Sequence, residues 1–331
     1  MGLPAPGLPI YHGAIDVHHH IVPDPYRAAL RRGGVDSPIA DVDFPAWNVE
    51  ASLEMMDRQG IATAMVSLSV PGVSVPDPAL AVRLARETNE FMADLVNAHP
   101  GRFGAFAALP LPDTDAALRE LSYALDVLRL DSVGLFTHYG HTSLGDRVAE
   151  PVLAELARRR VVPFVHPSAP ADDGAHADLP ASVCEFPFAT TRMAARMLYN
   201  GVFERNPELR LILPHAGGTI PYLAQRLTFA PVIRPSMAEH APADPIEQLR
   251  RQYFDTAMSG NPYTLPSLRA FAPVSQILIG TDFPFMPAWS SEANGQQFVE
   301  HGGFTEAELT SVVRGNAETL YPMRARQRTP I

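Results

Sequence analysis

Short apolar runs alternate with longer, helix-patterned segments from one end of the chain to the other. The runs predict eight strands, at residues 14–18, 62–68, 103–107, 132–136, 161–165, 209–213, 252–256 and 276–280. Helical patterns lie between them, at residues 49–59, 78–98, 114–128, 151–159, 191–204, 220–227 and 262–271. This alternation is typical of parallel strands covered on both faces, and eight strands favour a closed α/β structure, a (β/α)8 TIM barrel. An open, doubly wound sheet is the alternative, but no glycine-rich phosphate loop follows the first run.

The length of the chain, 331 residues, suits one such barrel, so we expect a single domain over residues 1–331. Stretches without a clear pattern at 22–47, 167–187 and 283–303 follow the first, fifth and eighth runs. Long loops at one end of a barrel are where binding sites are built. We therefore expect a distorted barrel with a loop insertion after the first strand.

Composition narrows the classes of function. The net charge is −10 and the longest basic run is the three arginines at 158–160, so no nucleic-acid partner is expected. The single cysteine, Cys184, excludes an intrachain disulfide, which fits a reducing compartment. Residues 1–11 lack the basic and apolar stretches of a signal peptide, and no apolar run is long enough to span a bilayer. We expect a cytoplasmic protein with no membrane partner.

A histidine cluster ends the first predicted strand. Side chains alternate along a strand, so His18 and His20 should share one side while His19 faces the other. Two imidazoles on one side at the end of a strand suit a divalent metal; a histidine cluster in a loop is the alternative. By the same alternation Asp16 should lie on the side of His18, either supporting a ligand or as a buried, hydrogen-bonded carboxylate.

Three further polar residues follow predicted strands. His166 closes the fifth strand, His215 comes directly after the sixth, and Asp282 comes after the eighth. Active-site groups of barrels come from the carboxyl ends of the strands, so these residues and the histidine cluster should converge. The convergence predicts a metal site and hence an enzyme; a barrel that only binds a small molecule is the alternative.

Six motifs run in the order of a known family. They are IDVHHHIVP at 15–23, MDRQGI at 56–61, VHP at 165–167, GVFERNP at 201–207, HAGG at 215–218 and GTDFPF at 280–285. With them the chain resembles the amidohydrolase superfamily over about residues 14 to 320. Within it, the chain is similar to the branch typified by 2-amino-3-carboxymuconate 6-semialdehyde decarboxylase, and residues 185–227 resemble the 6-methylsalicylate decarboxylase group.

The resemblance implies one divalent metal per chain, Zn²⁺ or alternatively Mn²⁺, held by His18, His20, His166 and Asp282. It implies that His215 is an acid–base residue that does not bind the metal, with Asp282 as a second proton carrier. Many benzoate decarboxylases of this branch have a glutamate where this chain has His18. No organic cofactor is expected.

The resemblance also suggests how a substrate is held. Arg226 lies where the semialdehyde decarboxylases have an arginine that binds a substrate carboxylate, often across a dimer interface; a solvated arginine on a helix is the alternative. A homodimer is therefore expected. The second carboxylate-binding arginine of that family has no match in residues 43–47, which favours an aromatic monocarboxylate. Phe285, Trp47 and Trp289 are candidate apolar walls for its ring.

Two reactions fit this set of residues. In the first, a small carboxylic acid, 2-hydroxybenzoate-like or muconate-like, loses carbon dioxide without oxidation, and His215 and Asp282 carry the proton. In the second, a lactone or amide is hydrolysed with help from the same two residues. The resemblance favours the decarboxylase.

Overall fold

The computed structural model describes residues 11–39, 42–169 and 179–322. The expectation about a signal peptide concerns residues 1–11 and so falls almost wholly outside the described part. Residues 170–178 of the stretch 167–187 lie outside it as well. No helix within the described ranges has both the length and the apolar character needed to cross a bilayer.

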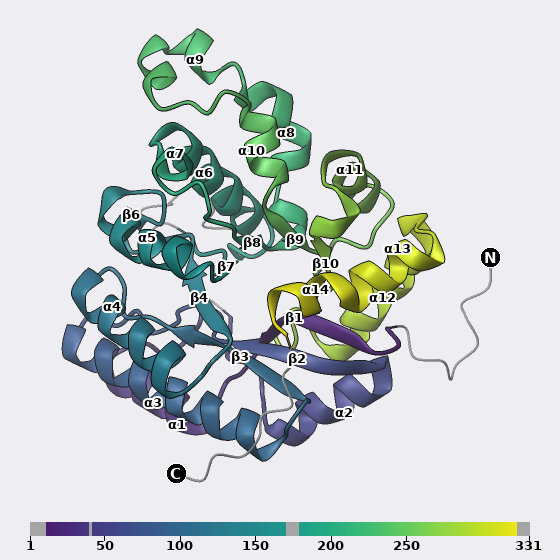
Figure 1. The fold of residues 1–331 in the computed structure, drawn as a ribbon. Helices are drawn as coiled ribbons and strands as arrows, with labels where there is room; N and C mark the ends of the chain where they lie inside the picture. The colour runs from purple at the N-terminus through teal and green to yellow at the C-terminus, as the bar shows by residue number, and fades with distance from the viewer. Residues whose placement is uncertain (1–10, 40–41, 170–178, 323–331) are drawn as a thin grey trace.

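Eight parallel strands form one sheet whose order follows the chain. They are β1 (Ala14–His20), β2 (Ile61–Ser67), β3 (Phe103–Ala108), β4 (Ser132–Phe136), β7 (Phe164–His166), β8 (Ile212–Leu213), β9 (Tyr253–Asp255) and β10 (Ile277–Leu278). The last strand returns to the first through parallel bridges from Asp16 to Ile279 and from His19 to Phe283, so the sheet closes. The predicted barrel is confirmed (Figure 1). A two-stranded hairpin, β5 (His138–Tyr139) and β6 (Thr142–Ser143), follows β4.

Helices surround the barrel (Figure 1). They are α1 (Asp24–Arg32), α2 (Val49–Gln59), α3 (Pro78–Ala98), α4 (Thr114–Ser122), α5 (Glu150–Arg159), α6 (Glu185–Tyr199), α7 (Val202–Arg205), α8 (Ile220–Leu227), α9 (Ala230–Ile233), α10 (Pro245–Arg250), α11 (Thr264–Phe271), α12 (Ala288–Gly302), α13 (Glu306–Thr310) and α14 (Asn316–Leu320). Three helices, α2, α3 and α8, have the predicted bounds. The side chains of Asn48 and Asp77 cap the first two by accepting backbone N–H bonds.

Two of the stretches expected to be loops contain helices. The insertion after β1 holds α1, which has Pro25 in its first turn and arginines in its last turn, both favourable there. The stretch 283–303 is mostly α12, whose buried positions are Ser291, Gly295, Phe298 and Gly302. These positions have helical spacing, but three of the four are small residues, so no apolar periodicity marks the helix.

Two predicted helices end earlier than expected. The helix expected at 114–128 gives way to a π-turn at Tyr123–Val127. The helix expected at 191–204 instead begins at Glu185 and ends at Tyr199. Gly201, with φ 72°, separates it from the short α7. A backbone in this left-handed conformation cannot continue a right-handed helix, and glycine adopts it at little cost.

A bulge in β1 changes which side chains face the barrel. The three-residue step from Asp16 to His19 faces only a two-residue step, from Ala64 to Val66, on β2. One extra residue in a strand moves the side chains that follow it to the opposite face. The bulge spans Asp16 to His19 and so includes His18, the first of the predicted metal-binding histidines.

The bulge explains which side chains of β1 depart from the predicted alternation between the two faces of the strand and which follow it. Asp16 does not share the side of His18: its Oδ2 lies 3.1 Å from Nδ1 of His19, and both residues are fully buried. Asp16 is thus the buried, hydrogen-bonded carboxylate that was one of its two expected roles. From His18 onward the alternation resumes, and His18 and His20 share one side, as predicted.

An apolar layer fills the barrel below the polar strand ends. Most of the strands contribute to it, through Ile15, Val17, Met65, Phe106, Phe164, Ile212 and Leu278. Tyr321, after α14, closes the layer: its ring lies 5.2 Å from that of Phe106, and its hydroxyl donates to the carbonyl of Val162. Phe164 forms the upper boundary, because its ring lies 5.8 Å from Phe106 on one side and 4.7 Å from His18 on the other.

Candidate metal centre

Four side chains from three parts of the barrel wall converge at the carboxyl ends of the strands. His18 and His20 come from β1, His166 ends β7, and Asp282 follows β10. Each is buried and offers one ligand atom, and these atoms all lie within 4.8 Å of one another. Nε2 of His18 and Nε2 of His20 lie 3.3 and 3.2 Å from Oδ1 of Asp282. The four residues expected to bind a metal are thus brought together.

Hydrogen bonds hold the three imidazoles in one orientation. Nδ1 of His18 lies 2.9 Å from Oδ2 of Asp255, and Nδ1 of His20 lies 3.1 Å from the hydroxyl of Ser67. Nδ1 of His166 donates to the carbonyl of Pro167 at 2.8 Å. Because each Nδ1 is engaged on the outside, Nε2 of His18 and of His20 is left for the centre, which is how ligating histidines are usually held. Nε2 of His166 lies 3.4 Å from the hydroxyl of Ser69.

The polar atoms at the centre fit a cation. Nε2 of His18, Nε2 of His20 and Oδ1 of Asp282 are buried and make no hydrogen bond within the described part of the chain. Buried polar atoms without partners are rare in folded proteins, and their convergence indicates a missing partner of positive charge. Three imidazole nitrogens and one carboxylate are the ligands that Zn²⁺ prefers.

Charge is concentrated at this site. Burial opposes ionisation of Asp282, but the neighbouring His18, His20 and His215 hold the pKa of its carboxyl well below the usual range. Burial would also lower the pKa of His18, yet the charges of Asp255 and Asp282 raise it to about 10. For His20 burial dominates and lowers the pKa to about 4. Asp282 and His18 thus stabilise each other's charged forms.

His215 lies beside this group without belonging to it. Its Nε2 is 3.5 Å from Oδ2 of Asp282, on the opposite carboxylate oxygen from the two strand histidines, and its Nδ1 is buried without a hydrogen bond. The backbone at His215 and at Asp282 has φ of 53° and 60°, values that non-glycine residues seldom adopt. Such conformations cluster at functional sites, where surrounding contacts hold them. Gly218, with φ 65°, completes the turn: a Cβ there would lie 2.2 Å from the carbonyl oxygen of Pro187.

Aromatic rings stand around the polar atoms. The ring of Phe285 lies 5.6 Å from His20, as expected of an apolar wall, and those of Phe186 and Phe136 lie 5.8 and 5.9 Å from His166. Phe186 and Phe136 were not among the residues predicted to line the site. Phe136 ends a predicted strand, so the rule that found His166 could have found it. Phe186 lies in α6, before the start expected for that helix, and carried no such signal.

The two tryptophans lie elsewhere. Trp47 donates from its indole nitrogen to the hydroxyl of Ser52, which also bonds Nε2 of His19 on the far side of β1. Trp289 is 71% exposed. Neither side chain therefore borders the four converging residues as a wall.

Arg226 lies on the exposed side of α8. It lines a surface depression with Tyr222, Leu223, Gln225 and Phe229. No contact joins it to the four converging residues of its own chain within the described ranges. A side chain in this place reaches either solvent or another molecule.

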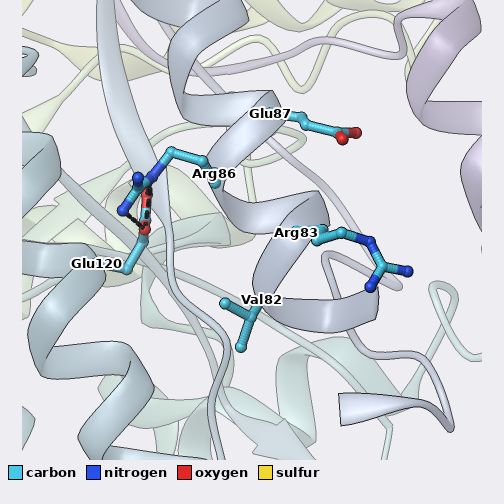
Figure 2. A pocket seen from close by; sticks show the side chains of 5 residues that line it. All are labelled: Val82, Arg83, Arg86, Glu87 and Glu120. Atoms are coloured by element: carbon cyan, nitrogen blue, oxygen red, sulfur yellow. Dashed lines mark hydrogen bonds and ion pairs between the residues drawn. The ribbon is translucent and has the colours of Figure 1, made fainter. Parts of the chain in front are cut away.

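A second surface depression lies on the flank of α3, where Figure 2 shows Arg86 pointing toward Glu120. Its floor is an ion pair between Arg86 and the buried Glu120, with nitrogen–oxygen distances of 2.9 to 3.3 Å. The guanidinium also lies 3.6 Å from the ring of Tyr123. Because the guanidinium of Arg86 is already paired and stacked, we interpret it as a contact that holds α3 against α4 and not as a binding site for a ligand.

Known proteins were compared with this chain. The amidohydrolase family pattern matches residues 15–323. The chain is 37% identical to the 6-methylsalicylic acid decarboxylase of Penicillium expansum and 38% identical to that of Aspergillus aculeatus, in both cases over 93% of this chain and 96% of the relative. A solved 2,6-dihydroxybenzoate decarboxylase, complexed with 2,6-dihydroxybenzoate, matches with a TM-score of 0.73 at 26% identity, over 94% of this chain and 99% of the other. The resemblance drawn from the six motifs is confirmed, and the chain belongs to the amidohydrolase family.

Proposed function

We propose that this chain is a metal-dependent, non-oxidative decarboxylase of a small aromatic acid with an oxygen next to its carboxylate. A 2-hydroxybenzoate such as 6-methylsalicylate is the expected substrate. The observation that carries the reaction type is the 37 and 38% identity to two 6-methylsalicylic acid decarboxylases over nearly the whole chain. The buried group of three histidines and one aspartate, with His215 beside it, supports the proposal by supplying the parts that such a reaction needs.

One divalent ion per chain would be held by His18, His20, His166 and Asp282. Zn²⁺ fits these donors, and Mn²⁺ is the alternative. When bound, the ion supplies positive charge that attracts the carboxylate and the neighbouring oxygen of the substrate.

The chain's own residues would handle the proton. His215 and Asp282 lie close enough to pass a proton between Nε2 and Oδ2 and are the acid–base pair of the site. The proton is added to the ring carbon that carries the carboxylate. The bond between that carbon and the carboxylate then breaks, its electron pair restores the aromatic ring, and carbon dioxide leaves.

The aromatic side chains support an aromatic substrate. Phe285 and Phe186 stand on either side of the histidines and would contact the faces or edge of a ring. Burying a flat apolar ring against such side chains is favourable, whereas a second carboxylate would lose its hydration there. This preference distinguishes a benzoate from a dicarboxylate.

A homodimer is part of the proposal. Apolar side chains on α8 and α9 are exposed, among them Tyr222 at 86% and Ile233 at 77%. Figure 1 shows α9 at the outer edge of the molecule, beyond α8 and α10. A second copy that covered this face would bury these side chains and place Arg226 in the interface, where it could anchor a carboxylate in either subunit.

A substrate screen tests the reaction. The purified protein is loaded with Zn²⁺ or Mn²⁺ and given 6-methylsalicylate, other hydroxybenzoates, muconate-like acids and lactones. We expect carbon dioxide from a hydroxybenzoate and, in D₂O, deuterium on the carbon that lost the carboxylate. Opening of a lactone or amide without carbon dioxide would instead establish the hydrolase. Light scattering on the same sample tests the dimer.

A further inference from the structure

Asp255 is a buried carboxylate that the proposed reaction does not use. It ends β9, and its side chain is fully buried. Oδ1 accepts two backbone N–H bonds, from His215 and Ala257, both at 3.0 Å. Oδ2 lies 2.9 Å from Nδ1 of His18. Asp255 was not among the residues predicted to form the site, although it lies near the end of a predicted strand just as His166 does.

The two backbone amides fix the orientation of the carboxylate. Both donate to the same oxygen, so a partial rotation of the group would weaken two buried hydrogen bonds at once, and a half turn only exchanges two equivalent oxygens. Oδ2 is therefore committed to His18. Gly280 adds a steric limit, because a Cβ there would lie 2.8 Å from Cβ of His18 and 3.1 Å from Cγ of Asp255. The side chains of Asp255 and His18 are thus packed against the backbone of Gly280.

An ionised carboxylate accepts hydrogen bonds and cannot donate them. The ring atom facing Oδ2 must then carry a proton, which places a proton on Nδ1 of His18. In the neutral ring the lone pair is on Nε2, and this atom lies 3.3 Å from Oδ1 of Asp282 at the centre. The hydrogen bond thus selects the form of His18 that can bind a metal.

We propose that Asp255 is a positioning residue of the metal centre, which holds the His18 ring with its proton on Nδ1 and its Nε2 lone pair toward the metal. The inference rests on the proposed function, because it requires a metal between His18 and Asp282. Through its other oxygen the same carboxylate joins the turn of His215 to this ligand.

The chain contains a matched pair for comparison. Asp16 is also fully buried, accepts backbone N–H bonds from His18 and Thr281 at 3.0 and 3.1 Å, and contacts a histidine ring, Nδ1 of His19, at 3.1 Å. Yet His19 lies outside the four converging residues. Asp16→Asn keeps an oxygen for these two N–H groups, so it reproduces the loss of a buried charge without removing a side-chain hydrogen bond of a proposed ligand.

The test compares Asp255→Asn with Asp16→Asn. In Asp255→Asn the amide oxygen stays with the two backbone N–H groups, so the NH₂ group faces His18. A donor in that place favours the ring form with the proton on Nε2, which cannot bind a metal. We expect the dissociation constant for Zn²⁺, measured by competition with a chelator, to rise about 10–100-fold, as is usual when a hydrogen-bond partner of a ligating histidine is lost. Asp16→Asn should bind Zn²⁺ as the wild type does.

Different outcomes separate this inference from the proposed function. Unchanged Zn²⁺ affinity in Asp255→Asn would overturn the inference alone. So would an equal loss in both variants, because it would report a general loosening of the strand ends. A wild-type protein that binds no divalent ion would overturn the proposed function and the inference with it. The free energy of unfolding of each metal-free variant, from urea titration, is measured alongside.

A second measurement is made on the wild-type protein, so its result does not depend on whether Asp255→Asn folds. The measurement is an NMR spectrum of Zn²⁺-loaded wild-type protein with ¹⁵N-labelled histidine. The ring of His18 should show a slowly exchanging proton bonded to Nδ1, and the chemical shift of Nε2 in the same ring should be changed by the metal. Spectra of His18→Gln assign the signal. A proton on Nε2 of His18, with Nδ1 bound to Zn²⁺, would overturn the proposal.

Discussion

The two ends of the barrel interior are built from the same strands but in opposite ways. In the lower half, apolar side chains from most of the strands pack on one another, and Phe106 and Phe164 stack with an interplanar angle of 21°. In the upper half, histidines and a carboxylate converge, and several of their atoms make no hydrogen bond within the described residues. Along β1 the change occurs within four residues, from Ile15 to His18.

The difference separates stability from function. Each large side chain buried in the lower half contributes on the order of 1.5–3 kcal/mol to folding. The upper half instead contains buried charge and, at His215 and Asp282, backbone conformations that cost energy. We infer that the burial of the apolar layer stabilises the strands enough to offset these unfavourable free-energy contributions at their ends. Substitutions in the two halves should therefore affect different quantities.

The largest effect is expected from Asp282→Ala in the upper half. This change removes a proposed ligand and a proposed proton carrier at once, so kcat should fall by at least about 10⁴-fold. Steady-state decarboxylation and the metal content of the purified variant measure it. Substantial turnover without Asp282 would contradict the assignment of both roles.

His215→Ala should act on turnover alone. His215 lies outside the four converging residues, so the metal should remain bound while kcat falls about 10²–10⁴-fold, the usual contribution of an acid–base group. Metal content and kcat are compared with those of Asp282→Ala. If the metal is lost as well, His215 belongs among the ligands.

Phe106→Ala should do the reverse in the lower half. The ring of Phe106 is buried against Phe164 and Tyr321, and its loss leaves a cavity. We expect the free energy of unfolding to fall by about 3–5 kcal/mol in urea titration, with kcat per folded molecule little changed. A variant of normal stability that has lost its activity would show that the two halves are not separate.

His19→Ala should have the smallest effect. The ring bonds Asp16 and Ser52 on the outer side of β1, and its removal leaves their buried polar atoms without this partner. A loss of about 1–3 kcal/mol in the free energy of unfolding is expected, with Zn²⁺ affinity unchanged. Weaker metal binding in this variant would mean that the two sides of β1 are coupled.

Local patterns carried much of the fold. The helices α2, α3 and α8 were predicted to the residue because periodic apolar side chains act within a few positions of one another, and in α2 and α3 a capping side chain adds a second local signal. α12 was not predicted because it lacks such a pattern. It packs through Ser291, Gly295 and Gly302, and small residues give no apolar periodicity in the sequence. Strand ends were less well placed, since pairing with neighbours decides where a strand stops.

For the site, the sequence by itself determined which residues could meet. Residues at the carboxyl ends of barrel strands converge because the strands are parallel and their carboxyl ends lie at the same end of the barrel. From the sequence alone, this rule selected the histidines of β1, His166 and Asp282. The same rule applied to every strand would have added Asp255 and Phe136. What it could not reveal is how these side chains are oriented.

Only the tertiary structure decided orientation. The bulge in β1 depends on pairing with β2, a strand more than forty residues away, and it alone placed Asp16 beside His19 instead of on the side of His18. In the same way the orientation of the His18 ring depends on Asp255, which lies 237 positions along the chain. Alternation and periodicity are local properties of a backbone, whereas register and hydrogen-bond partners are set by contacts between segments that meet only when the barrel closes.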